Sequence, residues 1–365
     1  MKYYCQSVNF VILLYKNDIT GADMKTIKPD NPNIDYMGRI DFSDSEKPMM
    51  IYAGSMARIK FTGTSVSAVL ENVKMNEKCW MGALVDGVQQ KFELLEGTNT
   101  YSLAEKLGSG EHTLVLLKRQ AAAYYVKICG IVVDDDAEIL PCDESSALKL
   151  EVYGDSVSAG EVCEAVYYEG ISDPEHKGEY DNAWFSYPLT VARKLGARIH
   201  DCSQGGLSLF DGTGYFYGPD HLTGLESTYD KLSYVPYAPM GCTKWDFSRY
   251  TPDFIIVAIG QNDANPDPDA IRTPEYSRRW KDKYIEIVNV LRDHYPKAKF
   301  IIITTLLMHD PIWDDVLDEI CLELNDKDII RHKFRRNGQA THGHPRITEQ
   351  EEMAEELRIL IQSLE

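Results

Sequence analysis

Long hydrophobic runs and dense basic clusters are both missing from this chain of 365 residues. The apolar stretch near its start, Val8–Tyr15, is far too short to span a bilayer. The charge balance is 38 basic against 57 acidic residues, a net charge of −19, and a field of that sign repels polyanions. We therefore expect neither a membrane nor a nucleic acid as a partner, whereas a neutral substrate carries no such penalty.

Paired cysteines are missing as well. The eight cysteines are scattered with no C-x-x-C pair, which predicts neither a zinc cage nor the disulfide framework of a small domain. Hydrophobic residues at 44% and charged residues at 26% are near the averages of soluble globular proteins, which excludes disordered and fibrous architectures. A chain of 365 residues exceeds what one core normally serves, so we expect two domains.

The N-terminus has two interpretations. Lys2 followed by Val8–Tyr15 begins like a signal peptide, but no small-x-small cleavage site follows before Asp18. The segment is either a degenerate leader or the product of an upstream in-frame start, with the functional chain beginning near Met24. We treat residues 1–33 as an N-terminal extension and expect a cytoplasmic location, with secretion left open.

The first half of the chain alternates with a period of two residues. Ala57–Phe61 and Val66–Leu70 have this alternation, which is typical of half-buried antiparallel strands. Asp86-Gly87 is a hairpin signal, and Gly108-Ser109-Gly110 precedes another strand-like run. The pattern predicts an all-β sandwich of jelly-roll type over residues 34–141.

The rhythm changes after the polar stretch Asp143–Ser146, where we place the domain boundary. Short, nearly continuous apolar runs now recur and predict strands buried on both faces of a parallel sheet: Leu148–Tyr153, Ala197–Cys202, Phe254–Ile259 and Phe300–Leu307. Helical segments at Trp184–Leu195 and Tyr276–Leu291 lie between them, and Thr348 with Glu351 forms a capping-box pattern before the last helix. Residues 147–365 therefore predict a doubly wound α/β domain, whose ligands sit beyond the carboxyl ends of the strands.

Four short blocks follow these strands or precede the last helix: Gly154-Asp155-Ser156, Cys202–Gly206, Gly260–Asp263 and Gly343-His344-Pro345. Ser156 is a candidate nucleophile, and the His344 imidazole could take its proton. Gly205 would let a backbone N–H approach a substrate, and the Asn262 amide could donate to an oxyanion. Each block alone is also explained as a turn. The four blocks together are a more specific signal of a catalytic site than any one of them.

Two alternatives at this site stay open. His342 lies two residues from His344 and is a rival base. A metal could in principle bind at His309-Asp310 or at His342 with His344, but no further ligands have a recognisable spacing. We therefore predict no metal site and no cofactor.

In this order the four blocks resemble the SGNH (GDSL) hydrolase superfamily, over about Leu148–Leu364. The resemblance implies a serine esterase with Ser156 and His344 as catalytic residues and Ser156, Gly205 and Asn262 forming the oxyanion hole. The preceding β-rich domain narrows the resemblance to one family. Three of its stretches are similar to carbohydrate esterase family 2: Arg58–Val66, Val85–Gly87 and Gly110–Arg119. That family implies deacetylation of plant polysaccharides such as xylan or glucomannan, so that the partner would be an acetylated carbohydrate.

The chain departs from the superfamily at Thr341, where an Asp normally stands three residues before the catalytic His. The resemblance then implies a Ser–His dyad, with a backbone carbonyl of the 341–343 loop holding the ring. Asp155 is expected to brace the turn before Ser156.

A long insertion, Leu207–Tyr250, separates the second and third strands of the predicted sheet and is rich in aromatic residues. Trp245 within it and Trp313 after the fourth strand are predicted to bind substrate, with core packing as the alternative. Two other functions are compatible with these residues: an SGNH lipase or thioesterase, and a carbohydrate-binding protein of weak or lost activity. The oligomeric state is left open.

Overall fold

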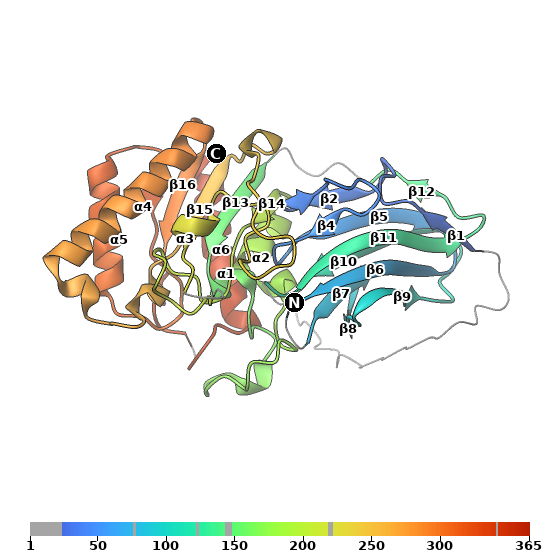
Figure 1. Ribbon diagram of the computed structural model, residues 1–365, viewed down its shortest axis with the longest axis horizontal. Helices are drawn as coiled ribbons and strands as arrows, with labels where there is room; N and C mark the ends of the chain where they lie inside the picture. The colour runs from blue at the N-terminus through green and yellow to red at the C-terminus, as the bar shows by residue number, and fades with distance from the viewer. Residues whose placement is uncertain (1–23, 76–77, 122–123, 143–147, 218–221, 341) are drawn as a thin grey trace.

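The computed structural model describes residues 24–75, 78–121, 124–142, 148–217, 222–340 and 342–365. Val8–Tyr15, Asp143–Ser146 and Thr341, on which three of the predictions rest, lie outside the described residues. Figure 1 shows two bodies side by side along the long axis, a β-sandwich drawn in blue and cyan and an α/β domain drawn in green to red. Among the described residues, no helix has both the length and the apolar character needed to span a bilayer.

The sandwich consists of two six-stranded antiparallel sheets. One has the order β3-β4-β11-β6-β9 with β1 beside β11, and the other β12-β5-β10-β7-β8 with β2 beside β5. The strands are β1 (Met24–Ile27), β2 (Asp35–Met37), β3 (Ile40–Asp41), β4 (Met49–Met50), β5 (Met56–Thr62), β6 (Val66–Lys74), β7 (Trp80–Val85), β8 (Val88–Glu93), β9 (Gly97–Ala104), β10 (Glu111–Lys118), β11 (Tyr124–Asp134) and β12 (Ile139–Leu140). Because β1 pairs with β11, the sandwich begins at Met24, inside the segment interpreted from sequence as an extension.

The second domain is built on a five-stranded parallel sheet with the order β14-β13-β15-β16-β17. Its strands are β13 (Lys149–Gly154), β14 (Arg198–Asp201), β15 (Phe254–Ala258), β16 (Lys299–Ile303) and β17 (Ile329–Arg331). Its α-helices are α1 (Ser156–Ala159), α2 (Tyr187–Leu195), α3 (Leu225–Thr228), α4 (Pro274–His294), α5 (Ile312–Leu324) and α6 (Ile347–Leu364), and its short 3-10 turns are η1 (Val166–Tyr168), η2 (Ala183–Phe185), η3 (Phe247–Arg249), η4 (Gln261–Ala264) and η5 (Ala270–Arg272).

Helices cover both faces of this sheet. Successive residues of a strand point to opposite faces, so each strand contributes side chains to the core on either side. In β15, Ile255 and Val257 pack in the core that contains Trp280 of α4, whereas Ile256 packs in the core that contains Met353 of α6. In Figure 1, α4 and α5 accordingly lie apart from α2 and α6. The predicted fold class, an all-β domain followed by a doubly wound α/β domain, is confirmed.

A buried ion pair fixes the sandwich to the sheet. Arg39, between β2 and β3, places Nη2 3.0 Å from Glu151 Oε1 of β13, and neither side chain is exposed. The same guanidinium donates to the Tyr153 hydroxyl and to the backbone carbonyls of Tyr229 and Lys231. Since charges in a protein interior are stable only when paired and hydrogen-bonded, the two domains are held in one relative position.

Two local predictions are corrected. Helix α6 begins at Ile347, so its N-cap is Arg346 and not Thr348, and the Arg346 N–H donates to Glu349 Oε2 at 3.2 Å. The buried side chain of Arg346 is held by groups outside the helix, which sets the start two residues earlier. Trp313 was expected in a loop but lies in the first turn of α5, where Val316 and Leu317 continue its apolar face.

Candidate active site

Ser156 lies where β13 ends and α1 begins, at the carboxyl edge of the parallel sheet. Asp155 caps α1, because its Oδ1 accepts the Val157 N–H at 3.0 Å. A Cβ on Gly154 would come within 2.2 Å of Ser158 Oγ and 3.0 Å of Ser203 Oγ, so only glycine fits this turn. Strands β13 and β15 flank the point at which the strand order reverses, where ligands of such sheets bind.

The structure brings His344 to Ser156. His344 Nε2 lies 2.8 Å from Ser156 Oγ, within hydrogen-bonding distance. His342, the alternative base, is an exposed residue. Gly343 has a φ of +95°, and a Cβ there would lie 2.3 Å from Asp173 Oδ1. Glycine is therefore required at position 343, both by the backbone conformation and by the carboxylate beside it.

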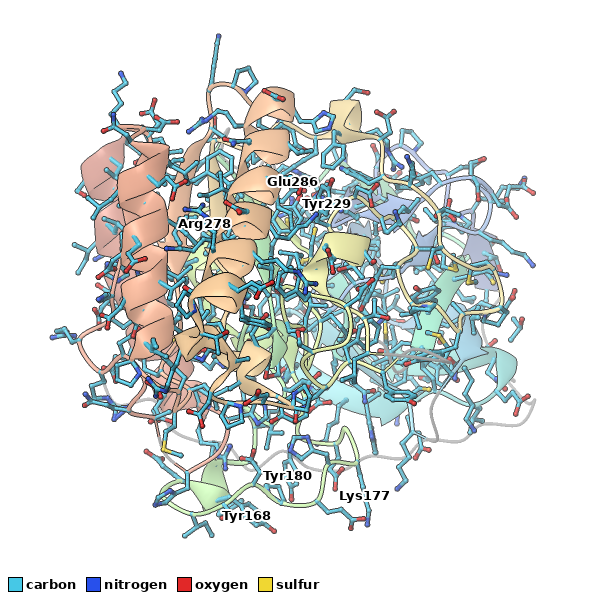
Figure 2. The ribbon with its side chains drawn as sticks, turned by 60° about the vertical axis from the view of Figure 1, so that its left-hand side comes forward. Tyr168, Lys177, Tyr180, Tyr229, Arg278 and Glu286 are labelled. Carbon is cyan, nitrogen blue, oxygen red and sulfur yellow. The ribbon has the colours of Figure 1, made fainter. Side chains whose placement is uncertain are left out.

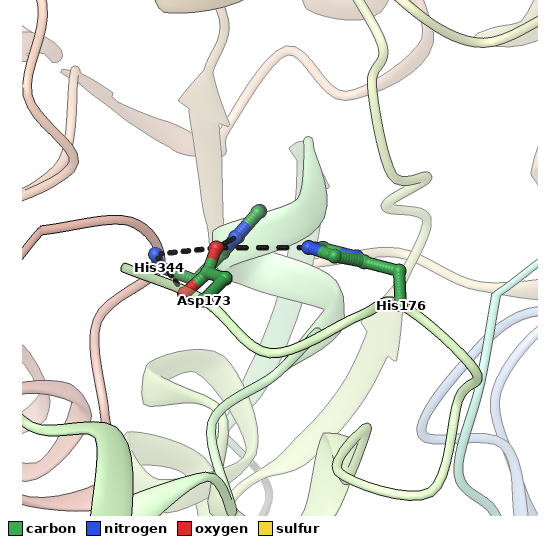
Figure 3. A group of neighbouring side chains, drawn as sticks. All are labelled: Asp173, His176 and His344. Carbon is green, nitrogen blue, oxygen red and sulfur yellow. Dashed lines mark hydrogen bonds and ion pairs between the residues drawn. The ribbon is translucent and has the colours of Figure 1, made fainter. Parts of the chain in front are cut away.

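Asp173 completes the group, as Figure 3 shows. Its Oδ2 lies 2.7 Å from His344 Nδ1, and its Oδ1 accepts the His344 backbone N–H at 3.1 Å and contacts Arg346 Nη1 at 2.7 Å. The prediction that a backbone carbonyl of the 341–343 loop holds the ring is wrong, since a carboxylate occupies that role. With Nδ1–H donating to Asp173, Nε2 carries the lone pair that can accept the Ser156 proton.

The charge on Asp173 is strongly stabilised. Burial alone would raise its pKa, but the interactions with His176, His344 and Arg346 outweigh burial and hold the pKa well below its usual range. Asp173 is therefore ionised at neutral pH. In turn, the Asp173 carboxylate raises the pKa of His176, and Glu161 and Asp181 add to that effect.

Asp173 belongs to the α1–α2 loop, residues 160–186, which contains no β-strand and only two 3-10 turns. Figure 2 shows Tyr168, Lys177 and Tyr180 on this loop, below the sheet and its helices. Asp173 is separated from His344 by 171 positions, so no motif spacing connects the two. His176, which the sequence analysis gave no role, also lies here, and its ring packs edge-on against His344 with centroids 5.4 Å apart.

Gly205 and Asn262 lie beside Ser156, as predicted from the strand ends. All three line a hollow of about 480 Å³ together with Glu161, His176, Gly206, Tyr215, Gln261, Leu307, Met308 and His344. Asn262 Nδ2 donates to Asp155 Oδ2 at 3.1 Å and to the Leu207 carbonyl at 3.0 Å. An oxyanion would therefore compete with one of these acceptors for an Asn262 hydrogen.

Asp155 ties the strand ends together, in agreement with its expected bracing role. Its Oδ2 accepts a hydrogen bond from the Gln261 side chain, and Gln261 Oε1 in turn accepts from the backbone N–H and the hydroxyl of Thr305. This chain links the ends of β13, β15 and β16. Burial raises the pKa of Asp155 to about 6, although the hydrogen bonds from Gln261 and Val157 act in the opposite direction.

Glu161 was not predicted from the sequence. Its carboxylate lies so close to Gly205 that a Cβ on that glycine would meet Oε1 at 1.8 Å. Burial raises the pKa of Glu161 to about 7, and repulsion from Asp181 adds to the effect. The site thus combines an ionised Asp173, behind His344, with the Glu161 carboxyl group, whose pKa is about 7.

A second, wider hollow of about 750 Å³ continues from the first and lies between the two domains. Met75, Lys78, Gln120 and Ala121 of the sandwich line it, with residues of the α1–α2 loop and of the 207–250 insertion opposite. Glu161, His176, Gly205 and Tyr215 line both hollows. Three tyrosines of the insertion line the wider hollow and are 64%, 62% and 38% exposed: Tyr215, Tyr217 and Tyr237.

The two tryptophans assigned to substrate binding lie elsewhere. Trp245 is 5% exposed and Trp313 is 1% exposed, and both belong to the core on the α4–α5 side of the sheet. Trp313 packs against Trp280 with centroids 5.4 Å apart, and Trp245 packs against His200 at 5.6 Å. Their rings are enclosed by neighbours and offer no face to a sugar, so the alternative of core packing replaces the substrate-binding assignment.

Comparisons with known proteins agree with this architecture. A family model described as carbohydrate esterase 2 N-terminal matches residues 36–142. The cellulase/esterase CelE of Acetivibrio thermocellus is 27% identical over 358 residues, which cover 92% of this chain and 40% of that protein. An acetylxylan esterase / glucomannan deacetylase of Cellvibrio japonicus is 26% identical over 280 residues, covering 76% of this chain and 72% of the relative.

Solved structures extend the comparison to both domains. Two structures of a family two carbohydrate esterase from Clostridium thermocellum, one an active-site mutant and one in complex with cellohexaose, match with TM-scores of 0.77 and 0.76. They are 25% and 24% identical and cover 91% and 90% of this chain and 98% of those chains. The resemblance to carbohydrate esterase family 2 is therefore confirmed, by the family model for the first domain and by the fold of these structures for both domains.

Proposed function

We propose that this protein removes O-acetyl groups from carbohydrates by a serine-esterase mechanism. The observation that carries the proposal is the continuous chain Ser156 Oγ, His344 and Asp173, with distances of 2.8 and 2.7 Å. Nucleophile, base and orienting carboxylate are the three parts of a serine-hydrolase triad. They lie at the carboxyl edge of the sheet, where a hollow gives a substrate access.

The first half-reaction forms an acyl-enzyme. His344 Nε2 accepts the Ser156 proton while Oγ attacks the ester carbonyl carbon, and Asp173 stabilises the imidazolium that results. The backbone N–H groups of Ser156 and Gly205 and the Asn262 amide are the proposed oxyanion donors. The tetrahedral intermediate then breaks its bond to the sugar oxygen, which takes the proton from His344 Nε2.

The second half-reaction releases acetate. Water enters the hollow, His344 Nε2 accepts one of its protons, and the hydroxide adds to the acyl carbon. Collapse of this intermediate breaks the bond to Ser156 Oγ, which recovers its proton from His344. Water is the only co-substrate that this mechanism consumes.

Three features support a carbohydrate as the alcohol part of the ester. The curated relatives are a cellulase/esterase and an acetylxylan esterase / glucomannan deacetylase, and this chain spans 40% and 72% of their lengths. The wider hollow is lined by exposed tyrosines, and ring faces of this kind can pack against the apolar face of a sugar. Its other lining groups are mostly polar, which disfavours a long acyl chain there.

The test is acetate release from 4-nitrophenyl acetate and from acetylated xylan or glucomannan. We expect turnover by the wild type on both, none by Ser156→Ala or His344→Ala, and full turnover by the matched control His342→Ala. A chain-length series of 4-nitrophenyl esters distinguishes this proposal from the lipase alternative. We expect the acetate to be hydrolysed faster than the butyrate and longer esters. Turnover that survives in Ser156→Ala would contradict the proposal.

A further inference from the structure

The cluster of Asp173, His176 and His344 has a second capacity that acyl transfer does not use. One potential ligand atom from each of the three lies within 4.8 Å of the others, and no other such group of three occurs in the described part of the chain. Asp173 Oδ2 is 2.7 Å from His344 Nδ1 and 3.6 Å from His176 Nε2. Ligands held about 2.0–2.2 Å from one Zn²⁺ ion in a tetrahedron are about 3.3 Å apart, so small side-chain shifts suffice.

We propose that Asp173, His176 and His344 form a reversible inhibitory site for zinc. Two imidazoles and one carboxylate are a donor set that zinc prefers, and three protein ligands leave the fourth tetrahedral position to water. The side chain of His176 is 50% exposed, which opens a path from solvent to the cluster. In Figure 3, dashed lines join the Asp173 carboxylate to both His176 and His344.

Binding at this site blocks the base. A neutral imidazole has one lone pair in the plane of its ring, and zinc bound to His344 Nδ1 uses it. The proton that was on Nδ1 then resides on Nε2, so no proton is lost from the ring. Nε2 can no longer accept the Ser156 proton, and the nucleophile stays a neutral hydroxyl.

The surrounding charges favour a cation at this place. Besides Asp173, the carboxylates of Glu161 and Asp181 act on His176 electrostatically. Arg346 opposes them, because it contacts Asp173 Oδ1 at 2.7 Å. That contact leaves Oδ2 facing the two imidazoles and holds the carboxylate in a fixed orientation. Hydrogen-bond partners of metal ligands commonly orient them in this way.

The first readout is zinc binding itself, measured by calorimetry on the Ser156→Ala protein with ZnCl₂. We expect one zinc per chain, and binding about tenfold or more weaker in Ser156→Ala/His176→Gln. Loss of a hydrogen-bond partner of a metal ligand already costs about tenfold in metal affinity, and loss of the ligand itself should cost more. The matched control is His112→Gln in the same background, because His112 also contacts a carboxylate, Asp86 at 2.7 Å, but belongs to no group of three in the described residues. MgCl₂ should give no binding at this site.

The second readout is inhibition of 4-nitrophenyl acetate hydrolysis by ZnCl₂, each variant being referred to its own rate in EDTA. We expect inhibition of the wild type that EDTA reverses, and a shift of the inhibitory concentration by at least about tenfold in His176→Gln but not in His112→Gln. This readout rests on the proposed function, whereas calorimetry does not. Absence of zinc binding to the Ser156→Ala protein, or unchanged zinc sensitivity in His176→Gln, would overturn the proposal.

Discussion

Two parts of the α/β domain supply the active site, and they are held in different ways. Ser156 follows β13, whose backbone is paired on both sides within a buried sheet. Asp173 comes from the α1–α2 loop, which has no strand, and its carboxylate is held by polar contacts to His344 and Arg346. The sheet therefore fixes the position of the nucleophile, while the orientation of the base depends on contacts that single substitutions can remove.

Several of the contacts that hold Asp173 come from the start of α6. Arg346 Nη1 donates to the His344 carbonyl at 2.6 Å as well as contacting Asp173, and Arg346 Nη2 donates to the Tyr168 carbonyl at 3.3 Å. At the other end of the loop, Asp181 Oδ1 accepts the Val162 N–H at 2.9 Å. The start of α6 thus positions both the base and the segment that carries its carboxylate.

Removal of the nucleophile should have the largest effect. Ser156→Ala takes away the only atom that attacks the ester, and losses for such variants are on the order of 10⁶-fold in kcat. Thermal unfolding should be unchanged, because a small hydroxyl at the edge of the hollow is lost. Steady-state hydrolysis of 4-nitrophenyl acetate and a melting curve measure the two quantities, and a large fall in Tm would mean that the turn itself has been disrupted.

The next effect tests the loop side of the comparison. Asp173→Asn keeps the size of the side chain but offers His344 an amide, which can hold the ring in the wrong tautomer. We expect kcat to fall by about 10⁴-fold with KM little changed. As a matched control, Glu175→Gln on the same exposed loop should retain wild-type turnover.

Loosening the loop without touching the reacting groups should cost less. In Arg346→Gln, Asp173 keeps His344 but loses its cation, and a displacement of the carboxylate by about 1 Å costs about 10- to 100-fold in kcat. Arg346→Lys should recover part of that loss if charge matters, since lysine restores one donor. Equal rates for the two variants would show that the guanidinium geometry alone holds the loop.

The smallest effect concerns stability and pH. Because the pKa of Glu161 is raised to about 7 in the folded protein, the folded state binds more protons than the unfolded chain between about pH 4.5 and 7, and stability falls as the pH rises through that window. Glu161→Gln removes the free-energy cost of ionising this buried carboxyl group. We expect its Tm to match the wild type near pH 4.5 and to exceed it by a few degrees at pH 8, measured by calorimetric scans. A Tm difference of the same size at both pH values would contradict this assignment.

The same contrast decides what the sequence could predict. Ser156, Gly205 and Asn262 follow strands, and short apolar runs locate strand ends well, so their meeting at one edge follows from the parallel topology. Asp173 has no such reference point, since a loop carboxylate can meet a histidine at any separation along the chain. The absence of an Asp at position 341 suggested a dyad for this reason, although a carboxylate from elsewhere performs the role.

The aromatic residues show a similar limit. Trp313 follows a strand end, which favoured a place in the site, but its apolar neighbours at helical spacing draw it into the core beneath α5. Within the 207–250 insertion, Phe216, Tyr234 and Trp245 are buried whereas Tyr215 and Tyr217 are exposed. Composition alone does not separate the two groups, because the separation depends on which ring finds partners once the insertion folds against the sandwich.

The measurement that tests the central claim most directly is the low-field proton NMR spectrum, in which an imidazole N–H hydrogen-bonded to a carboxylate gives a separate signal. The account predicts such a signal from His344 Nδ1–H in the wild type and in Ser156→Ala, and its loss in both His344→Gln and Asp173→Asn. A signal that disappears in His344→Gln but persists unchanged in Asp173→Asn would contradict the account, because another group would then be holding the base.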